Sequence, residues 1–262
     1  MNKIVKTSSA TGSISRVAYF FLVVLIFVLH GPLPASAELI NLQFQDSSVP
    51  SYSGAAVIGS SGDTWNQLTS STGSAGSLKN STGNISNVSV SWTGNGFWNG
   101  YSKSNANGFK GTAFDALMNS YLYTTPGSGL QTISFSNLQA STKYTLYMYT
   151  QADTDALGRA LTVTVNGLTQ TTTPTDYTAS TFIKGQNYLE FNATTDNSGA
   201  LLISYMSAPG TAHKEEADIN GIQLASAPTP EPSTLVLMGI GGLLVAFRFR
   251  KSGAGAGSIL SA

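Results

Sequence analysis

The sequence contains no cysteine, and only 10% of its 262 residues are charged. Without cysteine, disulfide cross-links, thiolate metal sites and cysteine nucleophiles are excluded. Residues 38–229 carry seven basic and twelve acidic side chains, a net charge of −5, with no cluster of lysine or arginine. Because a surface of that sign repels phosphate backbones, we expect no nucleic acid among the partners.

Residues 1–37 have the organisation of a secretory signal peptide. A basic stretch is followed by an apolar run over 17–29 and by the small residues Ala35 and Ala37. We expect the apolar run to form a signal helix and signal peptidase to cleave after Ala37. The alternative is an uncleaved membrane helix, which the two prolines after the run disfavour because they interrupt a helix.

A second apolar segment, residues 235–247, lies near the other end of the chain. The tripeptide before it is Pro230, Glu231 and Pro232, and the basic cluster after it is Arg248, Arg250 and Lys251. Thirteen helical residues reach ~20 Å, less than the ~30 Å hydrocarbon core of a bilayer. The segment therefore predicts a single transmembrane helix that holds weakly, with its basic end in the cytoplasm. A plain tail anchor is the alternative.

The order of tripeptide, apolar helix and basic cluster resembles the PEP-CTERM sorting segment of Gram-negative bacteria. The resemblance covers residues 228–251 and implies that an exosortase, a membrane protease, recognises the Pro-Glu-Pro motif. It also implies export across the inner membrane, a membrane-anchored precursor, and a mature form at the cell surface or in an extracellular polysaccharide matrix. We assign 227–252 to this segment. Residues 253–262 would be a flexible tail, longer than such proteins usually carry.

Residues 38–226 between these segments have the pattern of a β domain. Apolar residues alternate with polar ones, as in half-buried strands, over 40–44, 88–92, 161–165 and 201–205. The run 144–149 is apolar or aromatic on both faces, which favours a central strand, and 219–224 would be the last strand. Asn166-Gly167 between two Thr/Val-rich runs predicts a type I′ hairpin.

One stretch has helical spacing instead. Phe114, Leu117, Met118 and Tyr121 fall at i, i+3, i+4 and i+7, which predicts a short helix over 113–121. With one helix among many short strands, the predicted fold class is all-β, an antiparallel jelly-roll or β-sandwich. Segments 52–66, 144–147 and 217–224 resemble galactose-binding-like sandwiches. That fold is shared by many carbohydrate-binding modules and by domains without a ligand.

The chain offers little for catalysis. After removal of the signal peptide His213 is the remaining histidine, and no Gly-x-Ser-x-Gly motif accompanies it. A glycosidase needs two carboxylates, and the sequence does not pair those it has: Asp63, Asp153, Asp155, Glu190, Glu215, Glu216 and Asp218. We predict no catalytic residues, no metal site and no cofactor. Two interpretations remain for Asp153/Asp155 and for Glu216/Asp218. Either pair could bind a structural calcium, or all four could be solvated turn residues.

Binding of sugar needs flat aromatic faces near amide and hydroxyl groups. Trp98 and Tyr101, in what we expect to be an Asn/Gly-rich loop, have this setting, and Trp65 is a second candidate. The alternative is that these rings fill the edge of the core. We expect an exported, non-enzymatic protein associated with exopolysaccharide through its sandwich. The alternatives are a matrix protein without a ligand pocket and, third, a polysaccharide-cleaving enzyme.

Overall fold

The computed structural model describes residues 38–101, 103–125, 127–153, 159–174, 177–208 and 216–227. These residues belong to one compact unit, Ala37–Ala227. The expected signal helix and membrane helix lie outside the described residues. Within the described part of the chain, no helix has the length and apolar character needed to cross a membrane.

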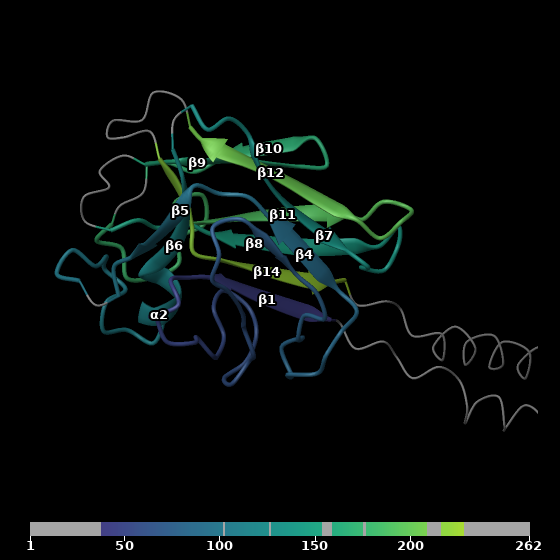
Figure 1. The fold of residues 1–262 in the computed structure, drawn as a ribbon, viewed down its shortest axis with the longest axis horizontal. Coiled ribbons are helices and arrows are strands. Elements are labelled where there is room, and N and C mark those ends of the chain that lie inside the picture. Colours follow the sequence, from purple (N-terminus) through teal and green to yellow (C-terminus); the bar gives the residue numbers. More distant parts are fainter. Residues whose placement is uncertain are drawn as a thin grey trace, which may run out of the picture. The chain divides into compact units, whose positions relative to one another are not determined.

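Three β-sheets build this unit (Figure 1). The five-stranded sheet has the order β11 (Tyr188–Thr194), β8 (Lys143–Tyr149), β14 (Gly221–Ser226), β1 (Leu39–Phe44) and β2 (Asn66–Leu68). The six-stranded sheet has the order β10 (Leu168–Thr171), β9 (Leu161–Val165), β12 (Leu201–Ser207), β7 (Gln131–Ser136), β4 (Ser89–Trp92) and β3 (Gly73–Ala75). The three-stranded sheet has the order β13 (Ala217–Ile219), β6 (Ser120–Thr124) and β5 (Gly96–Asn99).

The two larger sheets share one hydrophobic core, as the alternating sequence pattern requires. Phe44 from β1 and Phe191 from β11 lie in the same buried cluster as Phe135 from β7 and Tyr205 from β12. The all-β prediction is thereby confirmed, and so is the central position of β8, which lies between β11 and β14. Asn166 and Gly167 join β9 to β10 with φ angles of 49° and 78°, as a type I′ turn requires.

One strand pair departs from the expected antiparallel pattern. β2 runs parallel to β1, with Leu42 opposite Asn66. Two neighbours that run the same way need a crossover connection, and here residues 45–65 supply it. Gln43 binds this segment through its side chain, accepting a hydrogen bond from Tyr52 N at 2.8 Å. The amide side chain thereby fixes the crossover against the sheet.

The predicted last strand is divided at Asn220. Residues before it belong to β13 in the three-stranded sheet, and residues after it belong to β14 in the five-stranded sheet. The buried Asn220 amide donates to the carbonyl oxygens of Met118, Ser120 and Gln151 at 2.9 to 3.1 Å. The side chain adds these bonds to the backbone pairing of Asn220 with Tyr149 and Phe44, and so fixes the point where the chain changes sheets.

The predicted helix is shorter than expected. α2 covers Asp115–Met118, and Tyr121 lies in β6 instead. The predicted apolar stripe is present in part, since Leu117 and Met118 are buried together with aromatic side chains in a second cluster. The helix ends early because pairing of β6 with β5 and β13 takes over from residue 120. In Figure 1, α2, β5 and β6 lie together at one end of the larger sheets.

Candidate functional site

Trp98 is a half-exposed residue of β5, at the edge of the three-stranded sheet. Its relative exposure is 39%, and Lys103 Nζ lies 5.7 Å from its ring centre. Such a cation beside an indole face is attracted by the ring quadrupole. The expected loop is in fact a strand here, because β5 pairs with β6 from Gly96 to Asn99.

Tyr101 lies in the turn after β5 and is partly buried. Its backbone nitrogen donates to Asn99 Oδ1 at 3.0 Å, which fixes the turn. Among the described residues no ring contact joins Tyr101 to Trp98. The structure therefore leaves the two rings as neighbours in sequence without a shared aromatic platform. The sequence pattern did not point to Lys103, the residue that does contact Trp98.

Trp65 belongs to the interior, so the expectation of an exposed ring there is wrong. Its exposure is 6%, and its indole nitrogen donates to Gly54 O at 2.9 Å. The ring packs edge-on against Tyr52, with 5.3 Å between centroids. The crossover 45–65 packs against the five-stranded sheet, where Val57 N and Ile58 N donate to side chains of β8 and β14. Trp65, at the end of the crossover, is buried between the two. No face of Trp65 is left for a sugar.

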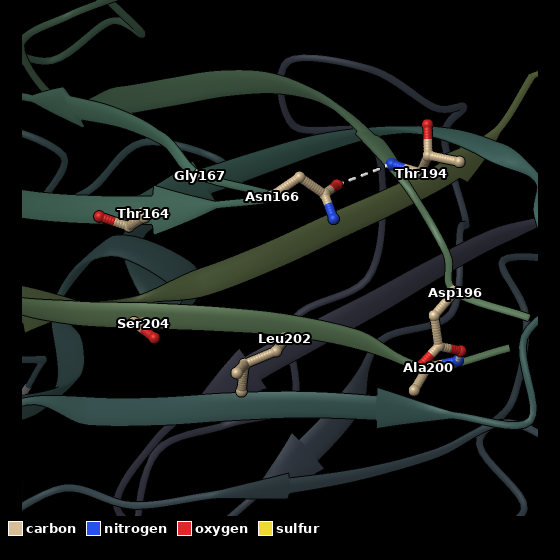
Figure 2. A pocket seen from close by; sticks show the side chains of 8 residues that line it. All are labelled: Thr164, Asn166, Gly167, Thr194, Asp196, Ala200, Leu202 and Ser204. Carbon is tan, nitrogen blue, oxygen red and sulfur yellow. Dashed lines mark hydrogen bonds between the residues drawn. The ribbon is translucent and has the colours of Figure 1, made fainter. Parts of the chain in front are cut away.

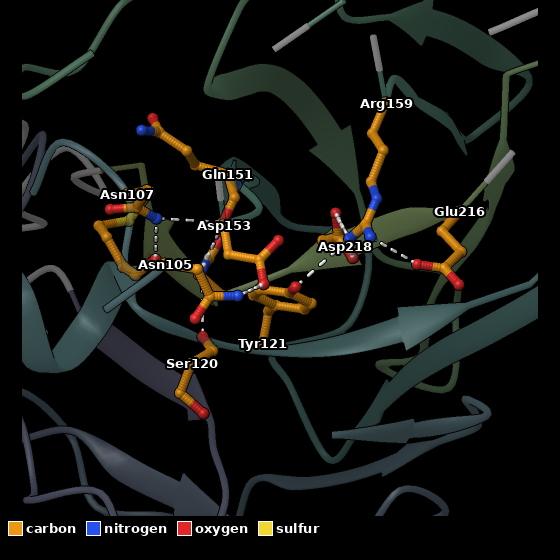
Figure 3. Close-up of polar contacts among 11 residues, drawn as sticks. Asn105, Asn107, Ser120, Tyr121, Gln151, Asp153, Arg159, Glu216 and Asp218 are labelled. Carbon is orange, nitrogen blue, oxygen red and sulfur yellow. Dashed lines mark hydrogen bonds and ion pairs between the residues drawn. The ribbon is translucent and has the colours of Figure 1, made fainter. Parts of the chain in front are cut away.

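A buried polar cluster is built on the three-stranded sheet, with Tyr121 from β6 and Asp218 from β13 (Figure 3). Arg159 contacts both Glu216 and Asp218, at 2.8 Å from Nη2 to Oε2 and 3.3 Å from Nη1 to Oδ1. Its Nη1 also donates to Tyr121 OH at 3.3 Å. On the other side of the cluster, Asn105 Nδ2 donates to Asp153 Oδ2 at 2.7 Å. Asp153 also acts electrostatically on Tyr121 and Asp218, so the cluster brings together residues far apart in the sequence.

Burial controls the ionisation of this network. Asp218 is 1% exposed, and loss of solvation raises the pKa of its carboxyl to about 7 although Arg159 opposes this. Burial also raises the pKa of Tyr121 well above its usual range. Arg159 stays charged, since a guanidinium does not lose its proton in proteins. Arg159 therefore forms ion pairs with two carboxylates at once and links Glu216 to Asp218.

The predicted calcium positions are affected differently. Thr154 and Asp155 lie outside the described residues. Glu216 and Asp218 are both bound to Arg159, so a guanidinium occupies the place that a cation would take between them. Within the described ranges no group of three or more acidic, histidine or cysteine side chains could hold a metal ion. Of the other residues considered for catalysis, Glu190 forms an ion pair with Lys184, 2.7 Å from Oε2 to Nζ. His213 lies outside the described residues.

The six-stranded sheet has an outer surface that the sequence analysis did not single out. We call it the hydroxyl face, and its residues are Ser74, Ser89, Ser91, Thr132, Ser134, Ser136, Thr162, Thr164, Thr169, Thr171, Leu202, Ser204 and Met206. The sequence feature that could have predicted this face is the alternation of Ser or Thr with apolar residues in these strands. Cross-strand hydroxyl pairs such as Thr164 with Thr169, at 2.8 Å, connect the positions.

A shallow hollow of about 380 Å³ lies at the border of this face, where Thr164, Leu202 and Ser204 meet the turns around Asn166 and Asp196 (Figure 2). Its lining residues are Thr164, Asn166, Gly167, Thr194, Asp196, Ala200, Leu202 and Ser204. Asn166 Oδ1 accepts from Thr194 N at 2.8 Å and so fixes the hairpin turn beside the hollow. Asp196 Oδ1 accepts from Ser198 N and Ala200 N, both at 2.8 Å. These hydrogen bonds lower the pKa of the Asp196 carboxyl.

By class, then, the chain is an all-β sandwich protein with a polar ion-pair cluster and a neutral outer face. Residues 228–251 match the family model of the PEP-CTERM protein-sorting motif. The chain carries that motif, which implies export as a membrane-anchored precursor and processing by an exosortase. The motif residues Pro230, Glu231 and Pro232 lie outside the described residues, as do the signal-peptide residues Ala35 and Ala37 and the basic residues Arg248, Arg250 and Lys251.

Comparison with curated proteins finds no match. Solved structures with partial similarity to this chain include the ANX2 ectodomain from Arabidopsis thaliana, with 14% identity over 75% of this chain and 54% of that one, TM-score 0.45. The ANXUR1 extracellular domain from the same plant has 15% identity over 75% and 52%, TM-score 0.42. An exo-β-1,3-galactanase from Phanerochaete chrysosporium, solved with β-1,3-galactotriose, has 16% identity over 60% and 30%, TM-score 0.30. The chain spans about half the length of the two ectodomains.

Proposed function

We propose that this chain is an exported, non-catalytic surface or matrix protein of a Gram-negative bacterium. Its sandwich would be of the galactose-binding-like kind and would hold exopolysaccharide after exosortase processing. The observation that carries the proposal is the match of residues 228–251 to the PEP-CTERM protein-sorting motif. The signal-peptide pattern of residues 1–37 supports the same route, because export must precede processing outside the membrane.

Substitution of the motif should block processing. With Pro230, Glu231 and Pro232 all changed to alanine, we expect the precursor to keep the apolar segment 235–247. The wild-type protein should lose that segment in cells with an active exosortase and keep it in cells without one. Intact-mass spectrometry of the protein from the cell envelope reads both termini at once. A wild-type protein that stays uncut beyond Pro232 in the presence of exosortase would contradict the proposal.

Sugar contact is proposed at Trp98. Its indole is 39% exposed, and hydrogen-bonding groups of Asn99 and Ser48 lie beside the same strand, with Asn99 Nδ2 donating to Ser48 Oγ at 2.8 Å. Lys103 covers part of the ring and would have to share it with a ligand. Tyr101 would contribute its edge from the following turn. An aromatic face meets the C–H face of a sugar ring, and amides meet its hydroxyls.

Trp98→Ala should weaken binding of soluble exopolysaccharide fragments about fivefold. An aromatic contact is worth ~1 kcal/mol, which corresponds to that change in the dissociation constant. Affinity electrophoresis of the full chain through gels with and without the fragments measures the difference. Trp98→Phe is the matched control, because it keeps a flat ring and should keep most of the affinity. Equal retardation of Trp98→Ala and wild type would remove Trp98 from the site and favour a matrix protein without a pocket.

A further inference from the structure

The hydroxyl face differs from an ordinary sheet exterior in its charge. None of its residues is Lys, Arg, Asp or Glu, although the described part of the chain carries charged residues elsewhere. Sheet exteriors that have only to stay soluble use charged side chains, which also prevent association. The hydroxyl face instead offers donors and acceptors without a net charge. Its chemical complement is a surface that is likewise neutral and rich in hydrogen-bonding groups.

An apolar stripe runs along β12 in the middle of this face. Leu202 is 55% exposed and Met206 is 37% exposed, with Ser204 between them. Strand β9 borders the stripe on one side, where Thr164 lies opposite Ser204. Strand β7 borders it on the other side, where Ser134 lies opposite Leu202. The stripe is therefore flanked by hydroxyl groups on both sides.

This arrangement matches the two kinds of surface on a sugar chain. A pyranose ring has apolar C–H faces and a rim of hydroxyl groups. Neighbouring strands are ~4.8 Å apart and alternate residues along a strand are ~6.6 Å apart, so hydroxyls recur on a regular grid. An extended chain lying along β12 would place its C–H faces on Leu202 and Met206. Its hydroxyls would reach Thr164 on one side and Ser134 on the other.

The hollow of about 380 Å³ lies at the Leu202 end of the stripe and is continuous with it, since Leu202 and Ser204 line both. The charged side chain that lines it, Asp196, is held by backbone donors and keeps its negative charge. A carboxylate at this place repels an acidic polymer and accepts hydrogen bonds from a neutral one.

The geometry points to the hydroxyl face as a second binding surface, distinct from Trp98, for an extended neutral polysaccharide. The inference shares with the proposed function the assumption that the ligand is a polysaccharide. It differs in the site and in the form of the polymer, because a sheet face contacts a long chain or a fibre surface along its length. A short soluble fragment would cover only part of the stripe.

The test is retention of the full chain on insoluble neutral polymers. The protein is purified in a polyoxyethylene detergent, which has no sugar headgroup, and mixed with microcrystalline cellulose, curdlan or chitin, and with alginate gel as the acidic probe. We expect retention on at least one neutral polymer and none on alginate. The double variant Leu202→Glu, Met206→Glu should lower the binding constant at least tenfold. Both positions are exposed, so its melting temperature should stay close to that of wild type.

The control variant is Ile85→Glu, Ile183→Glu, which adds the same charge at exposed apolar positions off the hydroxyl face, 74% and 43% exposed. It should bind as wild type does. Equal binding by the Leu202/Met206 variant, equal loss in the control, or no binding of wild type to any neutral polymer would each overturn the inference. Analytical ultracentrifugation gives a further contrary outcome: a dimer that only the Leu202/Met206 variant dissociates would assign the face to a second copy. None of these results changes the termini read by mass spectrometry, so the proposed export and processing are judged separately.

Discussion

Replacing Arg159 with methionine should lower the free energy of unfolding by about 3–5 kcal/mol near pH 9, where Asp218 of the wild-type protein is ionised. The substitution keeps much of the side-chain volume but removes the cation that Asp218 and Glu216 share. Asp218 is 1% exposed, so its carboxylate would lose its partner without gaining water. Breaking a buried pair from one side is costly for this reason. Urea denaturation followed by far-UV circular dichroism measures the change.

The loss should depend on pH in a defined direction. Burial raises the pKa of Asp218 from its ordinary value of 3.8 to about 7 in the folded chain, so the folded state holds this proton more tightly than the unfolded state. The contribution of Asp218 to stability is therefore highest at low pH and falls as the pH rises from about 4 to about 7. Arg159 lowers the pKa of Asp218. Without Arg159, the decline of the free energy of unfolding with rising pH should therefore continue above pH 7. Below about pH 7 Asp218 is protonated in both folded proteins, so the deficit of the variant should be small and constant there. Above pH 7 it should grow by about 1.4 kcal/mol per pH unit.

The double variant Arg159→Met, Asp218→Asn is the control. It removes both charges, so it should recover a large part of the stability and lose the pH dependence that Asp218 causes. Glu216→Gln should cost much less than either change in the buried pair, because its side chain is more exposed. A single Arg159→Met variant whose deficit is the same at pH 5 and pH 8 would contradict the assignment of the buried charge to Asp218.

Local pattern was sufficient for most strands because a strand with one buried face repeats every two residues. The alternations at 40–44, 161–165 and 201–205 all correspond to strands of the two large sheets. The hairpin at Asn166-Gly167 was equally local, since two residues with positive φ are sufficient to define it. These features need no knowledge of the rest of the chain.

Features that depend on distant partners were not accessible in the same way. The helical spacing that includes Tyr121 is correct as a pattern, yet residue 121 pairs with Trp98 in β5. The division of the last strand depends on carbonyl groups near residues 118 and 151, which the Asn220 side chain binds. A sequence window around Asn220 contains neither partner, so it predicts one continuous strand.

The same limit applies to the candidate sites. Arg159 and Asp218 lie 59 residues apart in the sequence, and nothing local marks them as a pair. The hydroxyl face was within reach, because Ser and Thr alternate with buried residues in each of its strands, but the order of the strands that joins them is a tertiary property. Whether a tryptophan is inside or outside likewise depends on what covers it, and that separates Trp65 from Trp98.

Replacing Trp65 with alanine should lower the free energy of unfolding by about 3–5 kcal/mol, as for other large aromatic residues in a core. Its ring packs between Tyr52 and Tyr149, and its nitrogen binds Gly54 O, so the change leaves a cavity and an unpaired carbonyl under the crossover. Trp98→Ala is the matched control: its ring is 39% exposed, and it should cost well under half as much. Thermal and urea unfolding of the two variants give the comparison directly. If Trp98→Ala proved as destabilising as Trp65→Ala, Trp98 would be a packing residue, and the proposed sugar contact at β5 would lose its physical basis.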